Sequence, residues 1–262
     1  MIGYDNLEEF FLHFLNSKLS DVISSKNIYQ KFKIYYEKNF KNHEEILLLL
    51  KKYAYYYSAF IGKNEKYSVE INECLNSFSM INQTTIYPFL LLLFDDFESK
   101  KINEKEMIKI LKFLLSYTVR RIICEIPSNS LRGIYKSLYN RTIKSNQKDY
   151  YYKIVSFFEK IKTRDKIISD KEFKQALIYK PLYKKPICKF ILSTIENSTK
   201  EKIDILNLTI EHILPQKENS VVWKEEIGKN YKEVYELYLH TLGNLTITGL
   251  NSELGTKPFL EK

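Results

Sequence analysis

The segment NEKEMIKILKFLLSYTVRRIIC, residues 103–124, is the stretch of sequence on which the fold class depends. Its apolar residues recur at the three- and four-residue spacing of an α-helix and cover most of the helix circumference. A helix that is apolar on most sides is expected to lie in the middle of a bundle. The segment 43–61 has the same character, so the sequence predicts a mainly α-helical fold with these two helices at its centre.

Shorter helical patterns lie on both sides of these two segments. A first helix is expected to begin at Asp5-Asn6, and Ser169 with Glu172 forms the S-x-x-E pattern of a capping box. The remaining helices are expected at residues 27–40, 67–79, 84–98, 129–142, 147–161, 169–179 and 184–196. Together these helices predict a multi-helix bundle.

The pattern changes after Asn197-Ser198-Thr199-Lys200, which is the best candidate for a domain boundary. We therefore expect a helical domain at 1–200 and a second domain at 201–262. The second domain is predicted to contain a strand at 203–210, a short helix capped by Asn230 and Glu233, a strand at 242–248 and a final helix that begins near Asn251.

Composition excludes several classes of protein. The 262 residues are 44% hydrophobic and 28% charged, which is typical of a globular chain. Seven glycines and no G-x-G-x-x-G or G-x-x-x-x-G-K-[ST] motif argue against a self-contained nucleotide-hydrolysing enzyme. Three scattered cysteines without a C-x-x-C pair indicate buried free thiols. The longest apolar runs are too short for a membrane span, so a cytoplasmic protein without membrane contact is expected.

Net charge leaves the partner open. The chain carries +9, from 41 Lys and Arg against 32 Asp and Glu, which suits a polyanion such as nucleic acid. Only five of the 41 are arginine, so a compositional bias towards lysine would give the same excess. Exposed tyrosines near lysines, such as Tyr152, Tyr179 and Tyr183, are candidates for base stacking, although core packing is the more common role of aromatic residues at helical spacing.

Of the four histidines, His212 has the most informative surroundings. His13 lies among phenylalanines, His43 is at a helix start, and His240 follows a helix, where an imidazolium would suit the helix dipole. His212 stands in TIEHILPQ, residues 209–216, at the end of a predicted strand. An acid-His-apolar-apolar-Pro block followed by a strand, a turn and an Asn-led helix is the layout of a ββα-metal finger, in which a histidine deprotonates water beside one divalent cation.

Four segments of the second domain resemble one known family. These are IEHILPQ (210–216), LGNLTIT (242–248), NSEL (251–254) and KPF (257–259). Together they resemble the C-terminal His-Asn-His nuclease domain of GmrSD-like, modification-dependent (type IV) restriction endonucleases. FLHFLNSKLS (11–20) and YTVRRIICEI (117–126) resemble the helical middle region of the same family. The resemblance implies a mainly α multi-helix bundle followed by a small C-terminal ββα-metal finger.

The resemblance also implies roles for individual residues. His212 corresponds to the general base, and Glu211 and Asn251 correspond to the metal ligands. Asn244 corresponds to the middle Asn, which pins the loop and orients the histidine. Carboxylate and amide oxygens favour Mg²⁺ or Mn²⁺. Other residues are expected to support these or to contact DNA phosphates: His240 and Glu253 for the former, and Lys184, Lys185, Lys217, Lys224 and Lys257 for the latter, with Lys189 and Arg120-Arg121 as further candidates.

The implied function is a metal-dependent DNA endonuclease of bacterial defence against phage or other foreign, modified DNA. Family members commonly carry an upstream nucleotide-hydrolysing domain, and this sequence has none of its motifs. The alternative is therefore a catalytically silent DNA-binding or scaffolding subunit that needs such a domain as its partner. An RNA-cleaving toxin would share the same metal finger. The family's domain also continues past the KPF segment, so the nuclease domain is expected to be truncated at Lys262.

Overall fold

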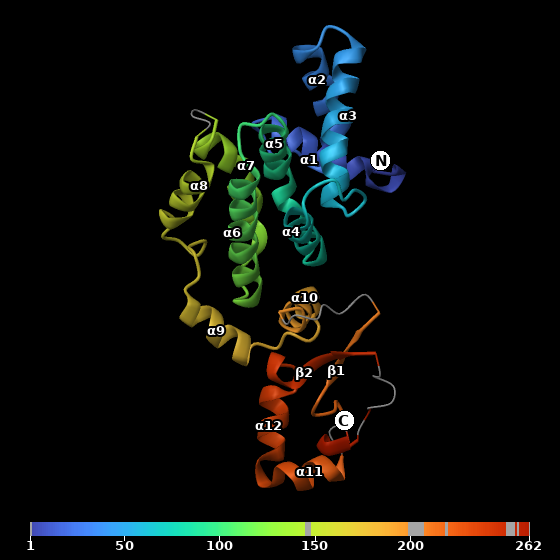
Figure 1. The fold of residues 1–262 in the computed structure, drawn as a ribbon, viewed down its shortest axis with the longest axis vertical. Helices are drawn as coiled ribbons and strands as arrows, with labels where there is room; N and C mark the ends of the chain where they lie inside the picture. The colour runs from blue at the N-terminus through green and yellow to red at the C-terminus, as the bar shows by residue number, and fades with distance from the viewer. Residues whose placement is uncertain are drawn as a thin grey trace. The chain divides into compact units, whose positions relative to one another are not determined.

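The computed structural model describes residues 2–144, 148–198, 207–217, 220–249, 255 and 257–261. The described chain is mainly helical and includes a two-stranded antiparallel sheet (Figure 1). It groups into two compact units: unit 1 comprises Met1–Thr118 and Pro127–Ile167, and unit 2 comprises Val119–Ile126 and Ile168–Lys262. The division into domains at residue 200 stays a prediction.

Unit 1 contains the helices that the apolar periodicity predicts. Each described helix begins and ends within a few residues of its expected bounds. These helices are α1 (Leu7–Lys18), α2 (Ile28–Asn39), α3 (His43–Phe60), α4 (Val69–Met80), α5 (Tyr87–Glu98), α6 (Glu104–Ile123), α7 (Leu131–Thr142) and α8 (Tyr150–Glu159), with the end of α6 from Val119 onward grouped in unit 2.

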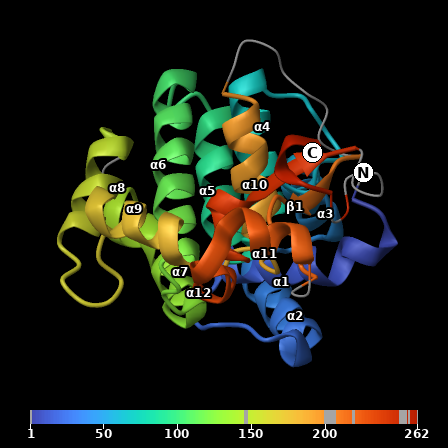
Figure 2. The ribbon, with the colours of Figure 1, turned by 90° about the horizontal axis from the view of Figure 1, so that it is seen from below.

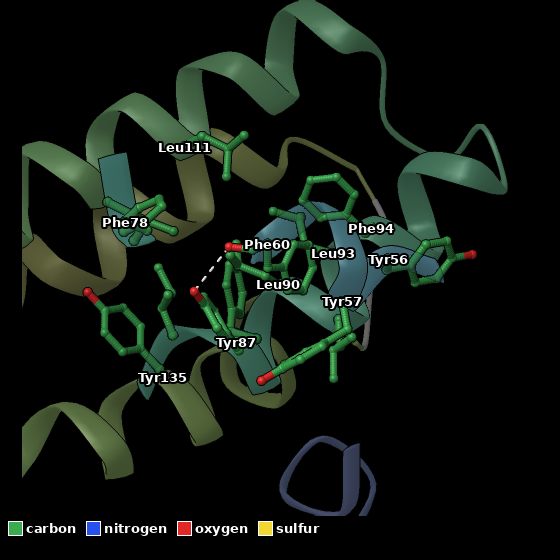
Figure 3. Close-up of a cluster of buried hydrophobic side chains, with 14 of the residues drawn as sticks. Tyr56, Tyr57, Phe60, Phe78, Tyr87, Leu90, Leu93, Phe94, Leu111 and Tyr135 are labelled. Atoms are coloured by element: carbon green, nitrogen blue, oxygen red, sulfur yellow. Dashed lines mark hydrogen bonds between the residues drawn. The ribbon is translucent and has the colours of Figure 1, made fainter. Parts of the chain in front are cut away.

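Helix α5 is the centre of unit 1. It packs against α1, α3 and α7, and both ribbon views show it running alongside α6 (Figures 1 and 2). Tyr87 and Phe94 of α5 are buried against aromatic rings of α3, and the hydroxyl of Tyr87 donates to the carbonyl of Phe60 at 3.2 Å (Figure 3). The aromatic residues of this unit are therefore used largely for core packing.

Helix α3 is expected at the centre of the bundle, but its first turns are exposed on one side. Leu47 and Leu48 are 62% and 61% exposed, whereas Tyr53, Tyr57 and Phe60 further along the helix are buried. The helix packs on α4 and α5 through the face that carries those rings. Its apolar run is thus wider than the face that the core covers.

Unit 2 combines helices with the small sheet. Its elements are α9 (Asp170–Tyr179), α10 (Pro186–Glu196), β1 (Thr209–His212), α11 (Val221–Ile227), α12 (Tyr231–Tyr238) and β2 (Leu245–Thr248). Helix α9 begins with the predicted capping box, in which the Ser169 side chain accepts from the Glu172 amide and the Glu172 carboxylate accepts from the Ser169 amide. Helix α10 packs on β2, and Leu214, Trp223 and Tyr231 form a small core under α11 and α12.

Four expectations for this unit need correction or lie outside the described residues. Residues 242–244 form a 3₁₀ turn rather than the start of a strand, because Asn244 bends the chain to bond a neighbouring loop. Helix α11 is not predicted by the sequence. The Asn230 side chain makes no capping bond, because a 3₁₀ turn at Gly228–Asn230 leads directly into α12. Residues 203–206 and the predicted helix start at Asn251 lie outside the described residues. The third element of a ββα finger stays a prediction.

Two sequence expectations about chemistry are tested by the described chain. No described helix is both long enough and apolar enough to cross a bilayer. Cys74 and Cys188 are buried free thiols, and burial raises the pKa of each to about 11. Cys124 is a half-buried free thiol, so all three cysteines are unlinked as predicted.

Candidate functional site

The candidate site lies where strand β1 ends. The strands pair antiparallel, with Glu211 opposite Thr246 and His212 opposite Leu245. Glu211 and His212 are both buried, although both side chains are ionisable. Consecutive residues of a strand point to opposite faces of the sheet, so the pair places one acidic and one imidazole group on either side of the strand end.

His212 is held by two aromatic neighbours. Its Nε2 lies 3.1 Å from Nδ1 of His240, which is hydrogen-bond distance. The ring of Tyr183 meets the His212 ring edge to face, with centroids 4.2 Å apart, and is stacked on the His240 ring at 5.4 Å. We call these three residues the histidine cluster. Its contacts fix the position and rotation of the His212 imidazole.

The histidine cluster depends on a loop that the sequence analysis did not connect to the site. The backbone amides of Leu182 and Tyr183 both donate to the carbonyl of His240, at 2.8 and 3.3 Å. Pro181 and Thr241 form an isolated bridge beside these bonds. The sequence predicts Tyr183 only as an exposed aromatic residue near lysines. No sequence signal pairs the 181–183 loop with His240, which lies 57 residues after Tyr183.

His240 is a partner of His212 at hydrogen-bond distance. Burial, with a smaller contribution from the charge of Lys184, lowers the pKa of His240. The neutral ring is therefore favoured near pH 7, and Nδ1 of a neutral ring can accept a hydrogen bond. If it accepts from Nε2–H of His212, the neutral His212 ring carries its lone pair on Nδ1.

Asn244 fastens the loop that follows His212. Its side-chain oxygen accepts from the Leu214 amide at 2.6 Å, and its side-chain nitrogen donates to the carbonyls of Leu214 and Leu239 at 3.1 and 2.8 Å. Its own carbonyl accepts from the Ile213 amide. One buried side chain thus ties the residues after β1 to the end of α12 and the start of β2.

Glu211 is the described part of the predicted metal site. Its carboxylate suits a hard cation such as Mg²⁺ or Mn²⁺, which completes its shell with water and phosphate oxygens. Asn251, the second predicted ligand, and Glu253 lie outside the described residues. Within the described ranges, no three His, Cys, Asp or Glu side chains gather as a ligand group. The donor chemistry fits the cation through Glu211 alone.

The predicted DNA-contacting lysines differ in their surroundings. Lys184, Lys217, Lys224 and Lys257 are exposed, and the ammonium group of Lys224 lies 5.8 Å from the ring centre of Tyr231. Lys185 instead pairs with Glu125 at 2.6 Å, and Lys180 pairs with the same carboxylate. Their hydrogen bonds lower the pKa of Glu125 to about 2. Lys185 therefore already has a counter-ion.

The Arg120-Arg121 pair is part of the internal structure of unit 2. Arg120 donates to the carbonyl of Ile168 at 3.0 Å and to the Asp170 carboxylate at 2.6 Å. Arg121 is 1% exposed. Since a buried guanidinium cannot reach a phosphate, Arg121 is not a DNA contact, and the expectation that included it is wrong.

The other two histidines occupy structural positions in unit 1. His13 is buried against the rings of Tyr57 and Tyr87, and burial together with the nearby charge of Arg132 lowers its pKa to about 4. His43 is exposed at the start of α3, where its Nδ1 lies 2.7 Å from the Tyr36 hydroxyl. These contacts of both histidines are with residues of unit 1.

An apolar cavity of about 780 Å³ adjoins the site within unit 2. It is lined by side chains of α9, α10, α12 and β2, among them Leu177, Leu192 and Ile247. Neither Glu211 nor His212 lines it. Asn244 does line it, together with Leu214, so the cavity borders the loop that follows His212.

Comparison with known proteins gives one match. Residues 167–262 match the family model of GmrSD restriction endonucleases, C-terminal domain. No curated protein and no solved structure matches the chain. The matched region begins one residue before Ile168, where the longer segment of unit 2 begins, and it contains every residue of the candidate site.

Proposed function

We propose that this chain is a metal-dependent DNA endonuclease of the His-Asn-His type. The proposal starts from the family to which residues 167–262 belong, the C-terminal domains of GmrSD restriction endonucleases. That membership supports a restriction-endonuclease type of function. The substrate we propose is foreign DNA that carries modified bases, met in the cytoplasm in defence against phage. The observation that carries the catalytic proposal is the fixed imidazole of His212 at the buried end of β1.

His212 acts as the general base in this proposal. In the tautomer we propose, Nε2–H of His212 donates to Nδ1 of His240, and Nδ1 of His212 takes the proton from the attacking water. The water oxygen forms a new bond to phosphorus while the bond from phosphorus to the leaving ester oxygen breaks. The products are a phosphate monoester and a hydroxyl end. A base positioned in this way contributes about 10²- to 10⁴-fold to the rate.

Glu211 and Asn251 are the residues that would hold the divalent cation. Bound there, Mg²⁺ or Mn²⁺ would stabilise negative charge on the phosphate and the leaving oxygen. Asn244 does not touch the substrate in this scheme. It holds the loop after His212 in one conformation, through the three bonds to Leu214 and Leu239. Exposed lysines near the motif, Lys217 and Lys224 among them, would contact phosphates without choosing a sequence.

The test is nicking of supercoiled plasmid by the purified chain with Mn²⁺ or Mg²⁺. We expect nicking that EDTA abolishes and that falls by about 10²-fold or more in His212→Ala. His43→Ala is the matched control, because it removes an exposed imidazole from unit 1 and should leave the rate unchanged.

Three outcomes would contradict the proposal. Nicking that persists in His212→Ala would remove His212 as the base. An intact plasmid with the wild-type chain, together with DNA binding that is equal in EDTA, would favour the silent DNA-binding subunit. Such a subunit would need a partner domain that hydrolyses nucleotides, and adding that partner is the experiment that would follow. Cleavage of RNA in preference to DNA would instead support the toxin.

A further inference from the structure

A cavity of about 490 Å³ opens on α7 and α8 of unit 1, and none of the residues of the candidate site lines it. Three cations line it, Arg141, Lys153 and Lys160, together with two aromatic rings, Tyr152 and Phe157. None of the described residues that line it is acidic. A cavity that combines cations with aromatic rings has the chemistry of a nucleic-acid site.

Helical geometry explains why these groups meet. Lys153, Phe157 and Lys160 are spaced four and three residues apart, so they share one face of α8 and its C-terminal end. Tyr152 and Ser156 follow the adjacent row of the same face. The guanidinium carbon of Arg141, at the end of α7, lies 4.9 Å from the ring centre of Phe157. This contact orients the planar donor group before any ligand binds.

Tyr152 is far more exposed than Tyr150, which lies on the same helix. Tyr152 is 78% exposed, whereas Tyr150 on the same helix is buried and donates to Asp96. An exposed ring costs no core packing when a ligand covers it. The position therefore suits stacking with a flat group, such as a nucleobase, better than it suits the fold.

A second basic cavity in unit 1 shows what distinguishes this one. The cavity beside α3, about 640 Å³, is lined by Lys51, Lys52 and Lys63 but also by Glu98. Lys52 pairs with Asp95 at 2.5 Å, and Glu98 pairs with Lys66 at 2.9 Å. Its lining thus includes a carboxylate, whereas no described residue that lines the cavity on α7 and α8 is acidic, so the second cavity attracts a polyanion less.

We propose that the cavity on α7 and α8 binds an unpaired stretch of a DNA strand. Phosphates of the strand would contact Arg141, Lys153 and Lys160, and one base would stack on Tyr152. The choice of DNA as the nucleic acid rests on the proposed nuclease function. The binding of a nucleic-acid strand rests only on the cations and rings that line this cavity of unit 1. A duplex cannot offer the face of a base to Tyr152, and for this reason the unpaired strand is the ligand.

The experiment measures binding of fluorescently labelled oligodeoxythymidylate, 20 nucleotides in length by design, in EDTA and at several salt concentrations. The triple variant Arg141→Gln, Lys153→Gln, Lys160→Gln should reduce the slope of log affinity against log salt by about 2, since each single-strand phosphate contact contributes about 0.7. Tyr152→Ala should weaken binding of the single strand by about 5-fold or more and leave binding of a duplex unchanged.

Matched controls lie in the same unit and do not line the cavity. The triple variant Lys26→Gln, Lys38→Gln, Lys41→Gln removes the same charge from exposed positions. Tyr29 on α2 is as exposed as Tyr152, so Tyr29→Ala removes an equal ring. If the cavity variants bind no worse than these controls, or if the wild-type chain does not bind the oligomer, the proposal is wrong. Tighter binding of oligouridylate would overturn the assignment to DNA.

The two proposals of this protein's function fail separately. His212→Ala should bind the oligomer as tightly as the wild-type chain, because it lies outside the cavity. Loss of nicking with intact oligomer binding concerns only the candidate site. Loss of oligomer binding with intact plasmid nicking concerns only the cavity on α7 and α8.

Discussion

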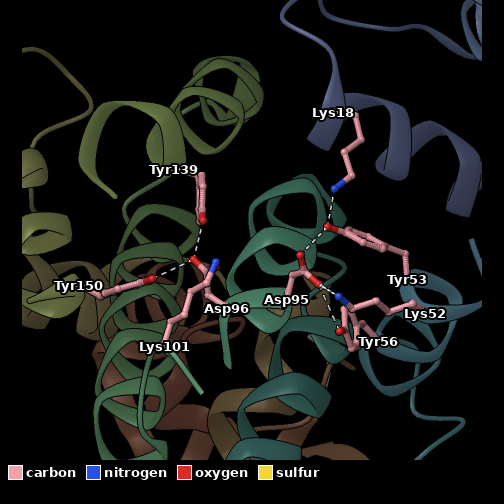
Figure 4. Close-up of polar contacts among 9 residues, drawn as sticks. All are labelled: Lys18, Lys52, Tyr53, Tyr56, Asp95, Asp96, Lys101, Tyr139 and Tyr150. Atoms are coloured by element: carbon pink, nitrogen blue, oxygen red, sulfur yellow. Dashed lines mark hydrogen bonds and ion pairs between the residues drawn. The ribbon is translucent and has the colours of Figure 1, made fainter. Parts of the chain in front are cut away.

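Each unit contains a buried polar cluster, and the two clusters are built differently. In unit 1, Asp95 and Asp96 of α5 face two separate sets of side chains (Figure 4). Asp96 accepts from Tyr139 and Tyr150 and pairs with Lys101 at 3.0 Å. In unit 2, Asn244 bonds to backbone groups, and His212 is held by the rings of His240 and Tyr183.

The partners show what each cluster does. Hydroxyl and ammonium groups from α3, α7 and α8 satisfy the two aspartates, so these carboxylates connect helices of the bundle to α5. The surroundings of the cluster also shift pKa values. Burial lowers the pKa of Lys18, which bonds to Tyr53, to about 8. Burial together with the Asp96 bond raises the pKa of Tyr150. The cluster of unit 2 instead fixes one imidazole. A buried charge is therefore not in itself a sign of catalysis.

The largest effect on stability should come from Asp96→Ala. The carboxylate is 2% exposed, and its removal takes away the oxygen to which the hydroxyls of Tyr139 and Tyr150 donate. We expect a loss of about 3 kcal/mol in the free energy of unfolding, measured by urea titration with circular dichroism.

Asp96→Asn is the matched variant, because its amide oxygen still accepts one hydroxyl and the volume is unchanged. It should retain most of the stability. A loss below about 1 kcal/mol in Asp96→Ala would mean that the aspartate does not connect the helices, and the contrast between the two clusters would fail.

Asn244→Ala should have the next largest effect. It leaves the amide of Leu214 and the carbonyls of Leu214 and Leu239 without their side-chain partner, at a cost of about 2 kcal/mol. Trp223 is the one tryptophan of the chain and packs with Leu214 in the small core, so its fluorescence reports this transition in urea.

Asn244→Asp separates the two halves of this interaction. The carboxylate still accepts from the Leu214 amide, but it cannot donate to the two carbonyls. Its stability should fall between those of the wild-type chain and Asn244→Ala. An alanine variant as stable as the wild-type chain would show that the loop is held by other contacts.

The helices were predictable from sequence because their periodicity is local. The apolar spacing of 103–124 sets the extent of α6, and Ser169 with Glu172 sets the start of α9. The partners of Asp96 were not predictable, because Tyr139 and Tyr150 are 43 and 54 residues away and no pattern connects them. A polar contact between helices depends on how the helices pack, which the periodicity of each one does not specify.

The candidate site was predictable in its motif and not in its support. The block around His212 and the segment around Asn244 stand out in the sequence, and the structure brings them together through the pairing of β1 and β2. Tyr183 was not linked to them, because it contacts His212 through a loop that the 197–200 boundary separates from the motif. Turn-forming residues in a sequence mark where one element ends and the next begins, and they do not show which segments pack together.

His240→Ala should have the smallest effect of these substitutions, and it distinguishes a fixed base from a merely buried one. Removing the ring takes away the partner of His212 Nε2, so the imidazole can rotate from its working position. We expect kcat for cleavage of an oligonucleotide substrate to fall by about 10-fold with KM unchanged, far less than in His212→Ala. In His240→Asn the amide group can occupy the place of Nδ1 and restore most of kcat. If alanine and asparagine are equally active at the wild-type level, His240 does not position the base. If both variants lower KM, kcat and stability together, His240 serves the fold. The histidine cluster of unit 2 would then have a structural role, like that of the aspartates in unit 1.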